Sequence, residues 1–153
     1  MQGSYAQIYI HIVFAVNGRQ SLINQSWEKE LYRYVSGIIK NKGQKPLAIN
    51  GMPDHLHILI GMKPSCCLSD LVREIKKSSN EFLKCRKYVG AYFRWQEGFA
   101  AFSYSHSNIG NVIGYIENQK EHHKVKTFKE EYFQFLSKFQ IEYKKEYLFD
   151  WID

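Results

Sequence analysis

The sequence predicts an α+β fold in which helices pack on one antiparallel sheet. Three observations predict it. Strand-like and helix-like segments alternate along the chain, two neighbouring strand segments are separated by only three residues, and each helix-like segment carries one apolar stripe. The chain has 153 residues, 44% of them hydrophobic and 16% aromatic, enough for one packed core. We therefore expect a single domain over residues 1–153.

The N-terminal part predicts a strand followed by a helix. Residues 5–16 are rich in β-branched and aromatic side chains and end at Asn17 and Gly18, a pair typical of turns. Residues 27–42 place apolar side chains at helical spacing, and Ser26 precedes them as the expected N-cap.

A hairpin is expected next. Residues 47–51 and 55–61 both favour strands, and Met52, Pro53 and Asp54 lie between them. Such a short connection predicts that the two strands pair antiparallel.

The rest of the chain predicts three helices and one more strand. Residues 68–83 carry one apolar stripe with Ser69 as a cap, and residues 99–104 favour a strand. Residues 108–123 and 128–143 have helical periodicity, the last with many aromatic side chains.

Charge and cysteine usage limit the class of protein. The net charge is +6, and residues 1–116 hold 14 basic and 7 acidic side chains, which favours an anionic partner, nucleic acid first. Three cysteines fit neither a zinc knuckle nor an extracellular disulfide framework, so we expect reduced thiols in the cytoplasm. The apolar runs are too short to span a membrane, and the N-terminus does not resemble an export signal.

Two histidines form the first candidate site. His55 and His57 are two residues apart on a predicted strand, so both imidazoles leave the same face and can share a divalent cation. The alternative is structural: one imidazole is half exposed and the other bonds a backbone carbonyl.

Tyr115 and Gln119 form the second candidate site. They lie four residues apart on a predicted helix, at the edge of its apolar stripe, where a phenol can reach a substrate. Gly110 and Gly114 nearby suggest close approach of another group, a movable helix or poor packing. The alternative is a tyrosine that packs at an interface while the glutamine forms a local hydrogen bond.

Basic side chains form a third feature. Arg73, Lys76, Lys77 and Lys84 fall on the side of a predicted helix opposite its apolar stripe, where nucleic-acid phosphates can bind. An ordinary solvated helix face is the alternative. His122 and His123 are each a further metal ligand or a surface residue, and the sequence does not choose between these roles.

Taken together, these residues resemble the single-tyrosine HUH transposases, small enzymes that move insertion sequences and repeated palindromes as single-stranded DNA. The resemblance runs over nearly the whole chain. It is carried by four groups of residues in order: the segment 11–14 (HIVF), the segment 51–60 (GMPDHLHILI), the segment 95–99 (WQEGF) with Ser103, and the segment 115–123 (YIENQKEHH).

The resemblance implies a ferredoxin-like HUH endonuclease fold and a role for each residue. Tyr115 would be the nucleophile that forms a 5′-phosphotyrosine, and His55, His57 and Gln119 would hold Mg2+ or Mn2+. Arg19 would contact DNA from the loop after the first strand. The substrate would be single-stranded DNA beside a hairpin. The family also implies a homodimer in which two sheets join, with the active site assembled within one chain or between two.

Two other classes of function stay open at this point. A non-catalytic nucleic-acid-binding regulator or domesticated relative would use the same charge and aromatic side chains without needing Tyr115, His55, His57 and Gln119 together. A metal-dependent nuclease using His55, His57 and His122 or His123 would activate water and form no covalent intermediate.

Overall fold

A four-stranded antiparallel sheet lies at the centre of the computed structural model, which describes residues 5–144. The strand order is β2-β3-β1-β4, and the strands are β1 (Tyr9–Ala15), β2 (Lys45–Met52), β3 (His55–Gly61) and β4 (Ala100–Tyr104). The α+β class and the hairpin between the second and third strands are confirmed. The outermost residues of the expected domain, 1–4 and 145–153, lie outside the described residues.

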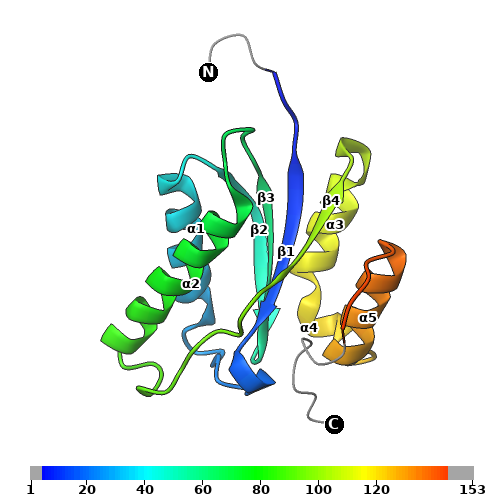
Figure 1. Cartoon of the computed structure of the whole chain (residues 1–153). Coiled ribbons are helices and arrows are strands. Elements are labelled where there is room, and N and C mark those ends of the chain that lie inside the picture. Colours follow the sequence, from blue (N-terminus) through cyan, green and yellow to red (C-terminus); the bar gives the residue numbers. More distant parts are fainter. Residues whose placement is uncertain (1–4, 145–153) are drawn as a thin grey trace.

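Helices cover both faces of the sheet (Figure 1). One face carries α1 (Glu28–Asn41) and α2 (Leu68–Cys85), and the other carries α3 (Ile109–Glu117), α4 (Gln119–His122) and α5 (Phe128–Lys138). Two short 3-10 helices, η1 (Asn17–Arg19) and η2 (His106–Asn108), follow β1 and β4. Within the described part of the chain, no helix is both long and apolar enough to cross a membrane.

The two central strands send alternate side chains to the two faces. Ile12 and Phe14 of β1, like Ile58 of β3, belong to the larger apolar cluster under α1 and α2. The intervening residues face α3, α4 and α5; of these, Val13 pairs with His57 across the β1–β3 ladder. One face is therefore a largely apolar core, whereas the other holds a cluster of buried polar side chains.

The sequence predicts one continuous helix over residues 108–123, which is wrong, because the structure has two helices there. The helix breaks at Asn118, whose φ of −99° and ψ of 20° depart from helical values, and α4 begins anew at the buried Gln119. Among residues 5–144, nothing lies within 4 Å of a Cβ placed at Gly110 or Gly114, so no described residue makes the close approach considered for these glycines.

Two predicted caps are also wrong, and one helix is shorter than expected. Helices α1 and α2 are preceded by Trp27 and Cys67 at the N-cap, and neither Ser26 nor Ser69 caps a helix. Ser69 already lies inside α2, where its hydroxyl cannot serve the first free N–H groups. Helix α5 ends at Lys138, and Gln140, with a φ of +53°, lies beyond it in the left-handed region.

Gly51 lets β2 approach the start of β3 closely. A Cβ at this position would lie 2.3 Å from the backbone oxygen of His55 and 3.1 Å from Cα of Leu56. Because these are backbone atoms, they cannot move aside without disturbing the hairpin that places His55 and His57.

We expect Gly51→Ala to lower the free energy of unfolding by about 1–3 kcal/mol, because the added methyl overpacks the hairpin. Gly37→Ala is the control, since a Cβ there meets nothing within 4 Å in helix α1. That change should raise stability by about 0.5–1 kcal/mol through helix propensity. Urea unfolding monitored by circular dichroism measures both, and equal stability of Gly51→Ala and the wild type would contradict the steric argument.

Candidate active site

His55 and His57 point from β3 into the layer of α3, α4 and α5, and both are fully buried. Their ring centroids are 5.2 Å apart. The ring of His55 stacks on Phe128 at 3.7 Å, which fixes its plane. The expected shared face is therefore present.

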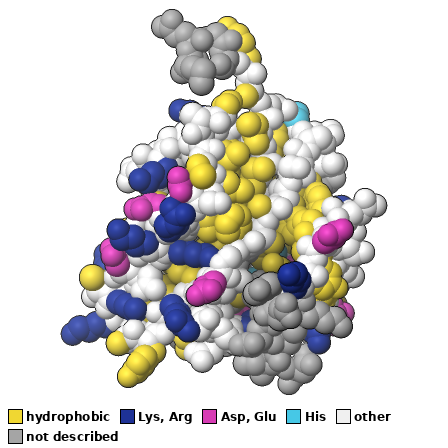
Figure 2. Space-filling model, viewed as in Figure 1, with side chains coloured by type: hydrophobic (Ala, Val, Ile, Leu, Met, Phe, Trp, Pro, Cys, Tyr) yellow, Lys and Arg dark blue, Asp and Glu magenta, His cyan; other side chains and the backbone are white. Residues whose placement is uncertain are grey.

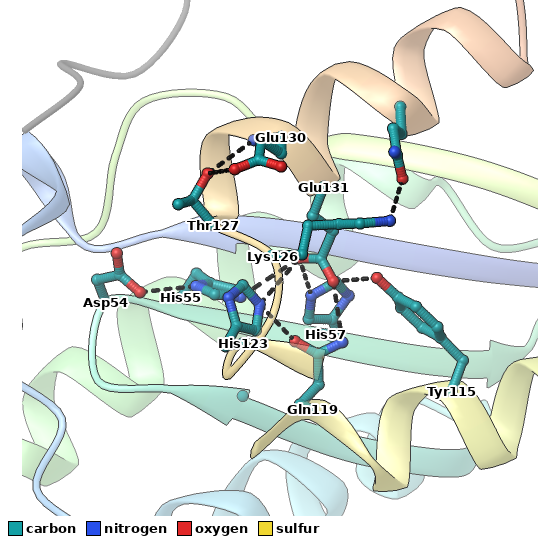
Figure 3. Close-up of polar contacts among 12 residues, drawn as sticks. Asp54, His55, His57, Tyr115, Gln119, His123, Lys126, Thr127, Glu130 and Glu131 are labelled. Atoms are coloured by element: carbon teal, nitrogen blue, oxygen red, sulfur yellow. Dashed lines mark hydrogen bonds and ion pairs between the residues drawn. The ribbon is translucent and has the colours of Figure 1, made fainter. Parts of the chain in front are cut away.

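The carboxylate of Glu131, from α5, lies between the imidazoles (Figure 3). Its Oε1 is 3.0 Å from Nε2 of His57, 3.6 Å from Nε2 of His55 and 3.3 Å from Nε2 of His123. Glu131 is buried, with a relative exposure of 2%. An anion at this depth is stable only because polar groups surround it.

Tyr115 and Gln119 reach the same carboxylate from the other side, as Figure 3 shows. The Tyr115 hydroxyl donates a short hydrogen bond to Oε2 of Glu131, and Nε2 of Gln119 donates to the same oxygen at 3.1 Å. The amide oxygen of Gln119 accepts from Nε2 of His123 at 3.1 Å. The break at Asn118 thus does not separate the predicted pair, because α3 and α4 both face the sheet at this point.

A second set of side chains orients the two imidazoles. Nδ1 of His55 donates to Oδ1 of Asp54 at 2.7 Å, and the guanidinium of Arg19 lies 3.5 Å from the other oxygen of Asp54. Nδ1 of His57 lies 2.8 Å from Nε2 of His11, which is fully buried on β1. Partners of this kind fix the ring orientation and tautomer of metal-binding histidines.

The donor set fits a divalent cation. Because Nδ1 of His55 carries the proton, its Nε2 presents a lone pair toward Glu131, and within residues 5–144 this buried atom has no hydrogen-bond partner. His55, His57 and Glu131 each offer one ligand atom, and these three atoms lie within 4.8 Å of one another. A lone pair facing a carboxylate is unfavourable, and a cation between them would remove the conflict.

Burial and hydrogen bonding set the protonation states. Burial lowers the pKa of His55 to about 4, although the hydrogen bond that His55 donates to Asp54 opposes this shift. Burial also lowers the pKa of His11 well below its usual value. The imidazoles of His55 and His11 are therefore neutral near pH 7, and a neutral imidazole at His55 is what metal ligation requires.

The pKa values of Tyr115 and Glu131 are shifted in opposite directions. Burial by itself raises the pKa of Glu131, but the neighbouring His57, His123 and His55 outweigh it and hold that pKa well below the usual range. Burial, and next the charge of Glu131, raise the pKa of Tyr115. In this arrangement Glu131 is an anion and Tyr115 keeps its proton.

The structure gives different positions to His122 and His123, whose roles the sequence did not decide. His123 contacts Glu131 and Gln119 and belongs to the cluster. His122 packs its ring on Tyr115, with centroids 4.4 Å apart.

The basic side chains of α2 lie on the sheet face opposite the histidines. Arg73, Lys77 and Lys84 are exposed there, on the side of the molecule where Lys and Arg gather in Figure 2. Arg73 pairs with Asp70 at 2.8 Å. Among the predicted DNA contacts, only Arg19 lies beside the histidines.

Lys76 does not belong to this exposed face, which corrects the sequence interpretation. Its Nζ donates to the backbone oxygens of Gln96, at 2.9 Å, and of Gly98, and lies 5.2 Å from the ring centroid of Phe14. Burial lowers its pKa to about 8. The ammonium group thus fastens the loop before β4 to the core.

Sequence reasoning missed Glu131, His11 and Asp54 as parts of the site. Glu131 has a signal, since it occupies the buried stripe of α5 between Phe128 and Phe135, where a carboxylate is unusual. His11 likewise interrupts an apolar strand. Neither signal says which groups meet, because that depends on how α5 and β1 pack.

Comparison with known proteins decides the family. Residues 4–119 match the sequence profile of the IS200-like transposases. The chain belongs to the IS200-like transposase family. The matched part includes His55, His57, Tyr115 and Gln119, whereas Glu131 lies beyond it.

Individual relatives agree with this assignment at low identity. The ISDra2 transposase TnpA of Deinococcus radiodurans is 20% identical over 125 residues, 78% of this chain and 89% of that protein. A crystal structure of a candidate transposase from Deinococcus radiodurans R1 matches with a TM-score of 0.61 at 21% identity, over 78% of this chain and 95% of that one. A REP-associated tyrosine transposase bound to a REP hairpin matches with a TM-score of 0.61 at 17% identity, over 80% and 73% of the two chains. These likenesses show the same fold.

We expect His11→Phe to weaken Mn2+ binding by about 10- to 100-fold, because the phenyl ring keeps the volume but leaves Nδ1 of His57 without a partner. His106→Phe is the matched control, since that exposed imidazole bonds only to Tyr9 at 3.1 Å among the described residues. Calorimetric titration of both variants measures the affinity. Equal affinity in His11→Phe and the wild type would remove His11 from the site.

Proposed function

We propose that this transposase cleaves and rejoins single-stranded DNA with Tyr115 as the nucleophile and a divalent cation held beside it. The observation that carries the proposal is the meeting of Tyr115, Gln119, His55 and His57 on the carboxylate of Glu131. A non-catalytic DNA-binding protein needs no such convergence of a phenol with two imidazoles on one buried carboxylate.

His55 and His57 would hold the cation through their Nε2 atoms, with Glu131 as the third ligand. Gln119 faces Glu131 with its amide nitrogen, so a half-turn of the amide is needed before its oxygen can bind metal. When bound, a divalent cation such as Mg2+ or Mn2+ polarises a phosphate oxygen and offsets its negative charge. His57 must then carry its proton on Nδ1, and Nε2 of His11 can accept it.

The covalent step exchanges one phosphodiester for another. Oη of Tyr115 attacks the phosphorus, the bond from phosphorus to the 3′-oxygen breaks, and a 5′-phosphotyrosine forms. The proton lost by Tyr115 ends on the released 3′-oxygen, so no water is consumed. A 3′-hydroxyl can reverse the step and rejoin strands, because the new ester keeps the free energy of the broken bond.

The proposal extends to the DNA contacts and the partners of the chain. Exposed Arg73, Lys77 and Lys84 would contact backbone phosphates, and Arg19 would do so beside the site. The hairpin bound to the REP-associated transposase supports a hairpin beside the cleaved strand here. β4 ends one side of the sheet, which supports a homodimer in which two sheets join. The free thiols of Cys66, Cys67 and Cys85 fit a cytoplasmic protein.

Tyr115→Phe should abolish covalent attachment to DNA while the fold and DNA affinity persist, since only the hydroxyl is lost. The measurement is a denaturing gel after incubation with labelled single-stranded hairpin DNA and Mn2+, followed by mass spectrometry of the linkage. Tyr132→Phe is the control, because that tyrosine packs on Phe128 of the same helix layer. Cleavage by the wild type without protein-bound DNA would favour a water-using nuclease, for which His123 is already at the site.

The double variant His55→Ala/His57→Ala should bind Mn2+ at least about 100-fold more weakly, because two of the ligands are lost. The single variants Glu131→Ala and Gln119→Ala then show which of these two side chains contributes more to Mn2+ binding. We expect the larger loss of affinity for Glu131→Ala. Calorimetry gives the affinities, with His122→Ala as the control. Unchanged affinity in the double variant would show that the metal binds elsewhere.

The charge-reversed variants Lys77→Glu and Lys84→Glu should each flatten the plot of log affinity against log salt by about one unit per lost phosphate contact. Lys76→Met is predicted to leave that slope unaltered and to lower stability, since its ammonium bonds Gln96 and Gly98. Fluorescence anisotropy at several salt concentrations provides the slope. If the slopes of Lys77→Glu and Lys84→Glu equal that of the wild type, these two side chains of α2 make no contact with DNA phosphates.

A further inference from the structure

A cavity of about 380 Å3 lies among α3, β4 and α5, and Tyr115 and Glu131 form part of its wall. Its size is within the range of cavities that bind small ligands. Two other cavities of the described chain, lined by residues such as Arg33 and Cys66, lie on the α1 and α2 side and do not touch Tyr115. The chemistry described above uses only the corner of the first cavity at Tyr115.

We propose that this cavity binds the base of the nucleotide whose 5′-phosphate becomes joined to Tyr115, so that the protein reads one base beside the cleavage point. The inference rests on the proposed function. Once the phosphotyrosine exists, that nucleotide is tethered to Oη of Tyr115, and the adjoining cavity is within reach of its base.

Three amide side chains equip the wall for base recognition. Asn108, Asn111 and Gln134 each carry a donor and an acceptor, the two kinds of group on the Watson–Crick edge of a base. Within residues 5–144, the side chains of Asn108 and Asn111 have no hydrogen-bond partner. Gln134 accepts from Lys126 and keeps its amide N–H groups for other partners.

Aromatic rings provide the stacking surface. Phe135 and Tyr104 both line the cavity and are half buried. Phe135 is held in place by Phe102, with centroids 5.0 Å apart and an interplanar angle of 20°, and it meets Tyr115 edge-on at 5.7 Å. Bases stack on such fixed rings in single-strand binding proteins.

The charge of the wall suits a nucleotide. Lys126 and Lys138 line the cavity, and Nζ of Lys138 lies 5.6 Å from the centroid of Tyr104. Among the described residues of the wall, Glu131 alone is acidic, and it already faces the imidazoles. An unpaired base with phosphates on either side therefore matches the amides, rings and lysines together, whereas a purely apolar ligand would leave the amides unsatisfied.

The test begins with a pool of single-stranded hairpin oligonucleotides with randomised nucleotides beside the hairpin. Covalent adducts of the wild type are digested, and the nucleotide attached to the phosphotyrosine is sequenced. We expect one base to be enriched there by about 10-fold, and an abasic site at that position to lower adduct yield by a similar factor.

Asn111→Leu should remove the enrichment, because its side chain cannot read the base. An abasic site should still lower the yield in this variant, since Phe135 and Tyr104 keep their stacking surface. Asn41→Leu, an exposed asparagine at the end of α1, is the matched control and should keep the wild-type preference. Adducts with no preference at the attached nucleotide in the wild type would overturn the base pocket and leave the tyrosine mechanism intact.

A second measurement decides the pocket even if no adduct forms and the proposed function fails. The side-chain amide signals of Asn108, Asn111 and Gln134 are followed by NMR while each deoxynucleoside 5′-monophosphate is added to the full chain. Shifts in these amides, absent in Asn111→Leu, would support a nucleotide site. Unmoved amides with all four nucleotides would reject it.

Discussion

A buried carboxylate is the group on which the polar half of this protein depends. Glu131 lies 2% exposed among three imidazoles, a phenol and an amide, which come from β3, α3, α4 and the segment after α4. A charge at that depth is costly unless its partners are all in place. The positions of α3, α4 and α5 on the sheet are therefore coupled to one another through this residue.

Because side chains alternate along β1 and β3, the residues of the larger apolar core and the residues of the candidate site lie on opposite faces of the sheet. Ile12, Phe14 and Ile58 pack under α1 and α2 in the larger apolar cluster, while the residues between them face the site. Gly51 and the short hairpin fix where β3 begins, and they thereby fix the positions of His55 and His57 along that strand. A rigid strand backed by a packed core is a suitable support for ligands that must keep their geometry.

The same carboxylate gives a physical reason for the proposed cation. Glu131 raises the pKa of Tyr115, after burial, and Nε2 of His55 points a lone pair at that carboxylate. Neutralising Glu131 would remove one cause of the high pKa of the phenol and the conflict with His55 together. Glu131 thus both orders this cluster and favours the protonated form of Tyr115.

The sequence by itself determined the alternation of strands and helices, the hairpin, and the shared face of His55 and His57. These features depend on the period of two of a strand and on short-range turn chemistry, which are local. The spacing of Tyr115 and Gln119 was likewise local, although the sequence did not show the break at Asn118.

Only the tertiary structure decided that Glu131, His11 and His123 belong to the site and that Lys76 does not belong to the basic face. Glu131 is 74 residues from His57 along the chain, and His11 is 46 residues from it. Contacts over such separations follow from how α5 and β1 pack on β3, because the burial of whole apolar faces fixes which side chains meet. No local pattern encodes that choice.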